Sequence, residues 1–176
     1  EWIAAGLIGK VREVHTWTNR PIWPQSSEMD RPSEAQKAPE GMDWDQWCGP
    51  APLRPFHASY HPGKWRAWWD FGTGSLGDMG CHIIDPAFMA LDLRYPISVE
   101  GNVSTVFETF GKKTTGKFES YPRSSVVRFK FPARGEMPPV TLTWWDGGLM
   151  PQRPDELEDD MPFGDPNGGN HQRGPN

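Results

Sequence analysis

The sequence predicts an α+β domain in which an open, mostly antiparallel sheet carries helices on one face. Three stretches, residues 97–107, 126–131 and 140–145, alternate apolar and polar side chains with the period of two that a strand shows. A fourth stretch, residues 11–18, is rich in β-forming residues but alternates less regularly. One apolar face and one polar face are typical of an antiparallel sheet that is covered on a single side.

The alternation assigns side chains to the two faces of each predicted strand. In the second stretch, Val127, Phe129 and Phe131 point one way, whereas Arg128 and Lys130 point the other way. The polar face is expected either to be solvated or to pair with another subunit. The other apolar positions are Ile97, Val99, Val103, Phe107, Val140, Leu142 and Trp144, and the polar ones include Ser98, Ser104, Thr141 and Thr143.

The helical cover of the sheet is predicted over residues 76–91. Ser75 and Asp78 resemble a capping box in which Asp replaces the usual Glu. Pro86 leaves two alternatives open: one continuous helix that bends there, or a second helix that Asp85 caps and Pro86 begins. The expected apolar stripe consists of Ile83, Ile84, Phe88 and Leu91.

The composition indicates one domain with much irregular backbone. The chain has 176 residues with 19 Gly and 19 Pro, and we expect a single domain over residues 1–150. Residues 20–70 are predicted to form a long loop region rich in Trp and Pro. Residues 151–176 are acidic and then rich in Gly and Asn, which indicates a loop or a flexible tail. Because residues 1–11 resemble the end of a helix followed by a turn and a strand, we expect the chain to be a fragment.

Charge and hydropathy narrow the classes of partner. The net charge of −5 argues against nucleic acid, because binding to phosphates needs a basic surface. No apolar run approaches the roughly 18 residues of a membrane span, so no membrane partner is expected. Cys48 and Cys81 lack the spacing of a metal site, and we expect both to be buried and outside any disulfide.

Residues Gly72, Gly74 and Gly77 have the G-x-G-x-x-G spacing of a dinucleotide-binding loop. Such a loop follows a buried apolar strand, whereas residues 61–71 here, HPGKWRAWWDF, are polar and aromatic. Asp78 would also place a negative charge in the first helical turn, where phosphates need N–H donors. We therefore expect the glycines to form a tight turn close to another backbone, and we assign no cofactor-binding residue.

Asp78, His82 and Asp85 follow that turn with spacings of four and three, which places them on one face of a helix. A carboxylate beside an imidazole fixes its tautomer and suits a general base. The spacing alone favours a buried structural histidine that a neighbouring carboxylate satisfies, and a metal site is a further alternative. His57 and His61 lie in a loop flanked by Pro and are interpreted as surface or packing residues, so no metal ligand is assigned.

Three longer stretches resemble a known family. They are GLIGKVREVHTWTNRPIWPQ, MDWDQWCGPAPLRPFHASYHPGKWRAWWDFGTGSLGDMGCHIIDPAF and MALDLRYPISVE. They are similar to the bacterial branch of the glucose–fructose oxidoreductase and inositol dehydrogenase family, Gfo/Idh/MocA. The resemblance is strong over about residues 1–107 and looser in the later strands.

The resemblance implies an enzyme of two domains, of which this chain corresponds to the C-terminal one. The missing N-terminal Rossmann domain would bind NAD or NADP and would carry the lysine of the E-K-P motif, for which Lys10 is no substitute. The D-x-x-x-H element of the family matches Asp78 and His82, and Asp85 matches an acidic position three residues later. The implied reaction is oxidation of a sugar or polyol hydroxyl, with His82 as proton acceptor and Asp78 orienting it.

The resemblance and the density of aromatic residues suggest which residues contact the substrate. Besides Asp85, we expect Arg20, Trp23, Arg66 and Trp68 to bind the sugar, because indole faces pack against the apolar face of a sugar ring. An NAD-dependent glycosidase and a non-catalytic domain for carbohydrate binding or oligomerisation are the alternatives. We expect a homo-oligomer formed through the open sheet face, located in the cytoplasm or, after export, in the periplasm.

Overall fold

The computed structural model describes residues 1–26, 29–105, 107–108, 112–113, 119–158, 160–165 and 170–172. The chain divides into two compact units, which are described separately below. Unit 1 contains residues 1–20, 79–103 and 124–176, and unit 2 contains residues 21–78 and 104–123.

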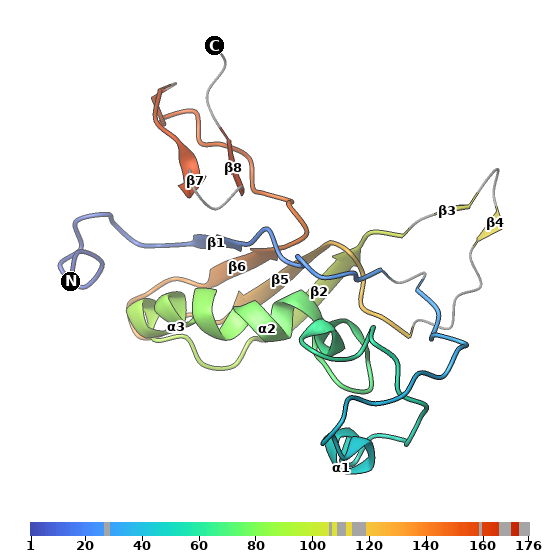
Figure 1. The fold of residues 1–176 in the computed structure, drawn as a ribbon. Coiled ribbons are helices and arrows are strands. Elements are labelled where there is room, and N and C mark those ends of the chain that lie inside the picture. The colour runs from blue at the N-terminus through green and yellow to red at the C-terminus, as the bar shows by residue number, and fades with distance from the viewer. Residues whose placement is uncertain are drawn as a thin grey trace. The chain divides into compact units, whose positions relative to one another are not determined.

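Unit 1 is built on a four-stranded open sheet, shown in Figure 1. Its strands are β1 (Glu13–Trp17), β6 (Val140–Trp145), β5 (Ser125–Phe131) and β2 (Ser98–Val103), in that spatial order. β1 runs parallel to β6, whereas the β6–β5 and β5–β2 pairs are antiparallel. The predicted α+β fold with a mostly antiparallel open sheet is confirmed.

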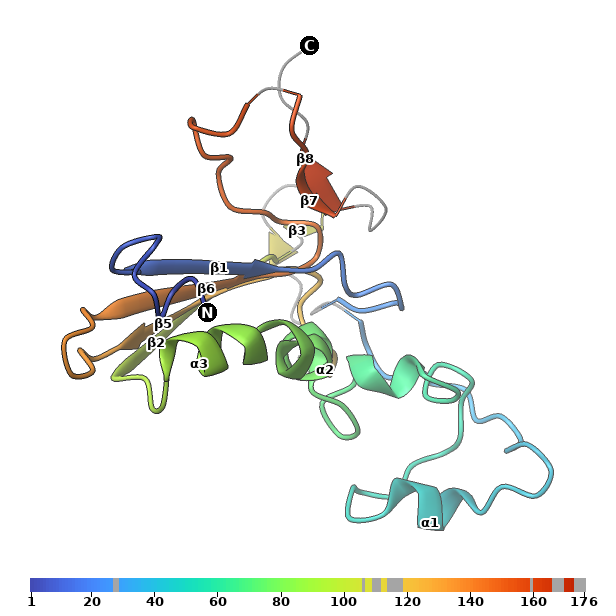
Figure 2. The same ribbon diagram turned by 90° about the vertical axis from the view of Figure 1, so that its left-hand side faces the viewer.

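One face of this sheet carries helix α3 (Asp85–Leu91), as the two views of Figures 1 and 2 show. The strands contribute their predicted apolar side chains to the core beneath it, with Val140 and Leu142 each 1% exposed. Phe88 meets Phe131 edge-on at 5.5 Å between ring centroids. The apolar face was therefore predicted correctly for β5 and β6. The core cluster is Leu91, Leu93, Phe131, Val140 and Leu142, with Ile84, Ala87, Phe88 and others packed against it.

Strand β2 departs from the prediction. All six of its residues are exposed, including Val99 and Val103 at 57% each, and the preceding Ile97 is 71% exposed. β2 is an edge strand that pairs with β5 alone, and its side chains take no part in the core cluster. An alternating pattern identifies a strand but does not show that its apolar side is covered. The predicted apolar position Phe107 has a side chain outside the described residues.

The predicted helix is broken in two near Pro86. Helix α2 (Gly74–Ile83) ends before Ile84, and α3 starts at Asp85 with Pro86 in its first turn. The alternative with a second helix is therefore confirmed, but its N-cap is Ile84 rather than Asp85. Pro86 is tolerated there because the first turn of a helix needs no N–H donor from it.

The predicted capping box at the start of α2 is wrong. Ser75 lies inside the first turn rather than before it, and its Oγ is buried without a hydrogen-bond partner. The main-chain N–H of Gly77 donates instead to the carbonyl of Thr73 at 3.3 Å. Because α2 begins at Gly74, two residues before the Leu76 start that the motif requires, the Ser75 side chain is directed into the protein and not to the free N–H groups.

Unit 2 is mostly irregular, as predicted for residues 20–70. Its regular elements, among the described residues, are α1 (Trp44–Cys48), the 3₁₀ helix η1 (Lys64–Ala67), the first half of α2 up to Asp78, and the short strands β3 (Phe107–Glu108) and β4 (Lys112–Lys113). Aromatic side chains replace regular structure as the source of packing. The buried core consists of Tyr60, Ala67 and Trp68, with Trp23, Met29, Trp44 and Phe71 packed around it.

In unit 2 a chain of charges runs from the buried side chain of Arg54 to the exposed side chain of Arg31. Asp70 forms ion pairs with both Arg54 and Arg31, and Arg31 also pairs with Glu119. The side chain of Arg54 is only 8% exposed, and its guanidinium lies 5.3 Å from the ring centre of Phe71. Desolvating a guanidinium is costly unless a carboxylate accompanies it. The pairing with Asp70 therefore allows a charged residue to lie among the aromatic side chains.

Outside these cores, two local expectations have different outcomes. Cys48 is buried, whereas Cys81 on α2 is exposed, so the prediction of burial is wrong for Cys81.

The region 151–176, predicted as a loop or tail, contains the two short paired strands β7 (Phe163–Asp165) and β8 (Asn170–Gln172). Trp17 of β1 contacts Phe163 of β7 at 5.1 Å between ring centroids.

A buried carboxylate connects the start of β5 to the end of β6. Asp146 is 3% exposed and accepts hydrogen bonds from the Trp144 indole at 2.9 Å, the Ser125 hydroxyl at 2.8 Å and the Ser125 main-chain N–H. Burial raises the pKa of Asp146 above its ordinary value of 3.8, although these hydrogen bonds act in the opposite direction. Three donors thus converge on one side chain at the edge of the core.

This site predicts a pH dependence of stability. Because the folded-state pKa of Asp146 is raised, the folded state binds more protons than the unfolded state above pH 3.8. The contribution of Asp146 to the free energy of unfolding should therefore fall as pH rises from 3.8 through the raised pKa. Urea unfolding of the wild type and Asp146→Asn, followed between about pH 4 and pH 7.5, measures this difference.

The difference in unfolding free energy between the wild type and Asp146→Asn should become smaller as the pH rises. The amide also replaces one acceptor by a donor, which should cost about 1–3 kcal/mol where the Asp146 carboxyl is protonated. Exposed Glu136 provides the matched control, because Glu136→Gln should change stability by less than about 0.5 kcal/mol. An advantage of the wild type that grows with pH would contradict this assignment.

Candidate active site

The turn before α2 is one of the tightest places in unit 2. A Cβ atom on Gly72 would lie 2.4 Å from the carbonyl oxygen and 2.5 Å from the Cα of Arg66. Gly74 has a φ of +62°, and a Cβ there would lie 2.7 Å from the ring of Tyr121. A Cβ on Gly77 would meet the side chain of Thr73 at 2.0 Å. The predicted tight turn close to another backbone is confirmed for Gly72, whereas Gly74 and Gly77 belong to α2 and lie against side chains.

The packing around these glycines shows whether the turn could bind the phosphates of a dinucleotide cofactor. In a dinucleotide-binding loop, the second glycine lets the pyrophosphate approach the backbone closely. Here the ring of Tyr121 lies beside the second glycine, Gly74, at 2.7 Å from the position of a Cβ. The residues of this turn do not fit the phosphates of a dinucleotide, and we derive no step of the chemistry from them.

Close packing at Gly72 positions Arg66, the residue that organises this part of unit 2. Its Nε donates to Oδ1 of Asp78 at 2.7 Å, and its Nη1 donates to the carbonyl of Gly63 at 3.1 Å. Its guanidinium lies 4.6 Å from the ring centre of Trp65 and 5.7 Å from that of Trp23. Two aromatic faces and one carboxylate therefore hold the cation in place.

Three of the predicted site residues, Trp23, Arg66 and Asp78, thus come together in unit 2. The side chains of Arg66 and Asp78 are 34% and 22% exposed, so the ion pair lies partly open to solvent. Trp23 is fixed by its indole N–H, which donates to Oε1 of Gln25 at 2.9 Å. Gln25 in turn donates to the carbonyl of Pro122 at 2.7 Å.

His82 and Asp85 both belong to unit 1 but to different helices. His82 lies in the last turn of α2, one turn after Asp78, and its side chain is exposed. Asp85 is the first residue of α3 and is also exposed. The expectation that a single helix carries all three residues is wrong, because the helix ends at Ile83. Only Asp78 and His82 keep the predicted spacing of one helical turn.

Arg20 is half-buried in unit 1. Its Nη1 donates to Oδ1 of Asn19 at 3.2 Å, and its carbonyl accepts a hydrogen bond from the N–H of Gly147 at 2.6 Å. The main chain at Arg20 is therefore tied to the turn that follows β6. This tie orders the main chain where the polypeptide leaves unit 1.

Trp68 differs from the other predicted substrate residues because its side chain belongs to the core. It is 2% exposed, its indole N–H donates to the carbonyl of Ser59 at 2.8 Å, and its ring packs against Tyr60 at 5.2 Å. Such a side chain has no surface left for a ligand, so we remove Trp68 from the substrate residues. The next residue, Trp69, was missed by the sequence analysis and is 53% exposed.

The loop histidines have packing roles, as interpreted from the sequence. Nδ1 of His57 lies 2.9 Å from the hydroxyl of Ser59, and the ring of His61 meets Trp47 edge-on at 6.0 Å. Within the part of the chain that the structure describes, no three or more His, Cys, Asp or Glu side chains are grouped as a metal site requires.

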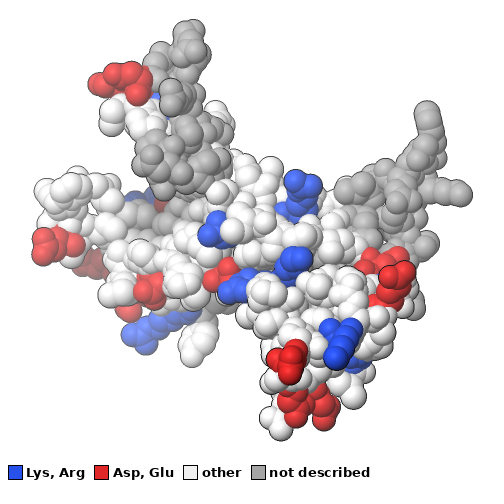
Figure 3. Space-filling view, in the orientation of Figure 1, with Lys and Arg blue, Asp and Glu red and all other residues white. Residues whose placement is uncertain are grey.

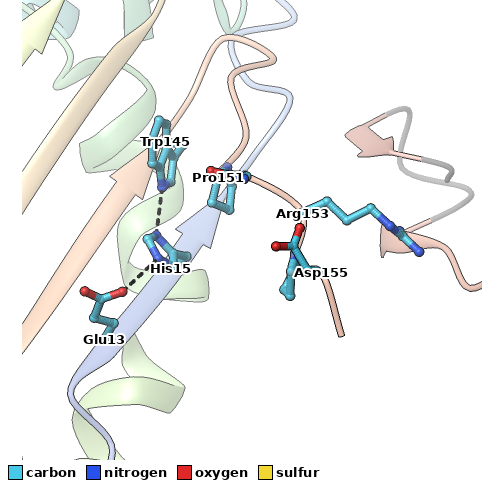
Figure 4. A pocket seen from close by; sticks show the side chains of 8 residues that line it. Glu13, His15, Trp145, Pro151, Arg153 and Asp155 are labelled. Atoms are coloured by element: carbon cyan, nitrogen blue, oxygen red, sulfur yellow. Dashed lines mark hydrogen bonds and ion pairs between the residues drawn. The ribbon is translucent and has the colours of Figure 1, made fainter. Parts of the chain in front are cut away.

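A hollow of about 430 Å³ lies on the sheet face of unit 1 that points away from α3. Figure 4 shows His15 between Trp145 and Glu13, with the side chain of Arg153 turned away from them. The Trp145 indole N–H lies 3.3 Å from Nδ1 of His15, and Nε2 of His15 lies 3.9 Å from the carboxylate of Glu13. Residues 151–155 line the other side of the hollow and thus cover part of the polar sheet face over β1 and β6.

The surface charge is mixed. In the view of Figure 3, Lys and Arg side chains are interspersed with Asp and Glu side chains, and the described residues on that face form no extended basic patch. No helix among the described residues is both long and apolar enough to cross a bilayer.

The sequence was compared with models of protein families. Residues 7–109 match the model of the C-terminal α/β domain of the Gfo/Idh/MocA oxidoreductase family. The chain belongs to the Gfo/Idh/MocA oxidoreductase family. A comparison with curated protein sequences gives no significant match. The matched segment of this Gfo/Idh/MocA domain contains every predicted site residue, and it ends before β5 and β6.

The packing at Gly72 leads to a stability prediction. Gly72→Ala places a methyl group within 2.6 Å of three main-chain atoms of Arg66, so the backbone must move. We expect the variant to lose about 1–3 kcal/mol of unfolding free energy, as overpacked sites do. Equilibrium unfolding in urea measures the loss.

Gly101 in β2 is the matched control, because nothing lies within 4 Å of a Cβ built there. Gly101→Ala should change stability by no more than about 0.5 kcal/mol. Equal stability of the two variants would mean that the approach of Gly72 to Arg66 does not constrain the turn.

Proposed function

We propose that this chain is the substrate-binding and catalytic half of an NAD(P)-dependent oxidoreductase that acts on a hydroxyl of a sugar or polyol. The observation that carries the proposal is the placement of Asp78 and His82 one turn apart on α2, inside the segment that matches the family. The exposed imidazole supports it further, because a proton acceptor must be accessible to its substrate.

His82 is proposed as the group that accepts the hydroxyl proton. Imidazole is the side chain best suited to take up and release protons near neutral pH. Its place in the last turn of α2 adds the carbonyl ends of the helix dipole, which favour a positive charge there.

Asp78 is proposed as a positioning residue that keeps the imidazole in a productive orientation. Its carboxylate is held by Nε of Arg66 at 2.7 Å. Because the guanidinium is itself fixed between Trp23, Trp65 and Gly63, the carboxylate has little freedom to rotate. A preorganised second group of this kind is what a general base requires to act in one geometry.

Arg66 and Trp23 are proposed to contact the substrate. The hydrogen bonds to Asp78 and Gly63 use Nε and Nη1 of Arg66, and the side chain is 34% exposed. We assign Nη2 to a sugar hydroxyl and the indole face of Trp23 to the apolar face of the ring. Arg20 and Asp85 keep their predicted roles as further hydrogen-bonding residues for the sugar.

The cofactor is proposed to be NAD or NADP, held mainly by residues outside this chain. When bound, the nicotinamide supplies the hydride acceptor, and the protein contributes position and a path for the proton. The described residues of this chain would bind and orient the alcohol and remove its proton at His82.

A homo-oligomer formed through the open sheet face is proposed as the assembly. Residues 151–155 already cover this face over β1 and β6, so the contact is assigned to its other half. There Lys130, Glu100 and Asn102 are exposed on β5 and β2. Such a polar surface suits an interface of paired charges and bound water.

The proposal predicts the effect of removing the base. His82→Ala should lower kcat by about 10²–10⁴-fold, because the alcohol then loses its proton only to water. KM for the sugar should change much less, since the imidazole acts mainly in the transition state. The assay follows nicotinamide absorbance with a panel of sugars and polyols, in the whole polypeptide that carries this domain.

His57 is the matched control, because it is a half-buried histidine that bonds to Ser59 in a loop of unit 2. His57→Ala should retain kcat within a few-fold. Full activity of His82→Ala would contradict the proposed role and favour a non-catalytic domain. Release of free sugar without net reduction of nicotinamide would show glycoside cleavage instead of net oxidation.

A further inference from the structure

Two adjacent tryptophans in unit 2 have opposite environments. Trp68 is 2% exposed in the core, whereas Trp69 is 53% exposed. An antiparallel bridge between Trp68 and Ser120 makes this segment locally extended. Successive side chains of an extended segment point to opposite sides, so burying one indole directs the other to solvent.

The backbone around Trp69 is held on both sides of the bridge. The N–H of Trp69 donates to the carbonyl of Glu119 at 3.1 Å, and the N–H of Tyr121 donates to the carbonyl of Ala67 at 2.9 Å. Ion pairs add a second tie, because Arg31 pairs with both Asp70 and Glu119. The exposed indole is therefore mounted on a fixed piece of main chain.

One face of the indole rests on Tyr121. The two ring centroids are 3.9 Å apart and the planes are inclined by 27°, which is a stacked arrangement. The phenol donates to the carbonyl of Gly72 at 3.0 Å, and burial raises the pKa of Tyr121, so the phenol keeps its proton. With one face supported and half of its surface still exposed, Trp69 presents a flat, rigid apolar surface.

Keeping such a surface in water has a cost. Exposed apolar area is unfavourable in proportion to its size, and indole is the largest apolar side chain. A loop residue without a ligand would be expected to rotate and fold back onto the protein. Stacking on Tyr121 instead fixes the ring in place, which lowers the entropy lost when a flat ligand binds.

We propose that Trp69, supported by Tyr121, is a stacking platform for a pyranose ring of the carbohydrate substrate. The proposal rests on the sugar specificity proposed above and names a residue that binds the ring without taking part in proton transfer. A pyranose whose hydroxyls are all equatorial exposes only C–H bonds on its faces. β-D-glucopyranosides are therefore the class that fits, because the C–H face gains dispersion and hydrophobic contact with the indole.

The test is a titration of this protein with cellobiose, without any nicotinamide nucleotide. Indole N–H resonances are followed by NMR in protein labelled with ¹⁵N, and the Trp69 signal is assigned by its absence in Trp69→Phe. We expect that signal to shift saturably with cellobiose and not with sorbitol, a linear polyol that has no ring face.

Variants then measure the contribution of the platform. Trp69→Ala should weaken cellobiose binding by about tenfold or more, the size expected when one large apolar contact is lost. Trp69→Phe should retain binding within a few-fold, because it keeps an aromatic face. Trp2, which is 72% exposed in unit 1, is the matched control, and Trp2→Ala should bind like the wild type.

Several results would overturn the platform. They are an unshifted Trp69 signal at saturating cellobiose, equal binding by Trp69→Ala, or a Trp69 signal that responds to protein concentration instead of sugar. If Trp69→Ala fails to fold by near-UV circular dichroism, Tyr121→Leu replaces it and should also weaken binding, because the indole loses its support. Cellobiose binding is read without nicotinamide, whereas the role of His82 is read from kcat of His82→Ala, so loss of the platform and loss of the proposed catalytic role give different results.

Discussion

Strand β6 is the element on which the sheet of unit 1 depends, because it joins the parallel strand β1 to the antiparallel strands and supplies the most deeply buried side chains. It runs parallel to β1 and antiparallel to β5, and it buries Val140, Leu142 and Trp144 to 1% exposure or less. The segment that matches the family contains β1 and β2, which occupy opposite edges of the sheet and do not pair with each other. Only the later strands join them, so the apolar surface beneath α3 requires residues up to Leu142.

The same strand ends in a polar junction. Asp146 follows directly after β6 and collects hydrogen bonds from Trp144 and from both polar groups of Ser125. A buried carboxylate is unfavourable by itself, and three donors offset much of that cost. The junction aligns the start of β5 with the end of β6, which sets the register of the two central strands.

Unit 2 reaches a stable interior by other means. Most of its backbone is irregular, so stacked aromatic rings and paired charges replace the ladder of hydrogen bonds that supports a sheet. Arg66 makes several of these interactions at once, because its side chain pairs with Asp78, bonds to Gly63 and lies over two indoles. The absence of a side chain at Gly72 allows this arrangement, since any larger residue would collide with the backbone of Arg66.

Sequence and structure together show which signals were informative for the site. The spacing of Asp78 and His82 predicted one helical turn correctly, because both residues lie inside a continuous helix. Asp85 follows the break at Ile84 and belongs to the next helix. The spacing of residues along the sequence does not show where one helix ends and the next begins near a proline. The two indoles of Trp68 and Trp69 are chemically identical, so composition alone could not separate the core residue from the exposed one.

The sequence by itself determined the α+β class, strands β5 and β6, the irregular character of residues 20–70 and the spacing of Asp78 and His82 by one helical turn. These features depend on local periodicity and residue type, which are properties of short stretches. Only the tertiary structure decided that the apolar side of β2 is exposed, that Ser75 does not cap α2, and that Trp68 is buried while Trp69 faces solvent. The physical reason is that burial depends on which distant segments pack against a side chain, and that information does not lie in the residues next to it.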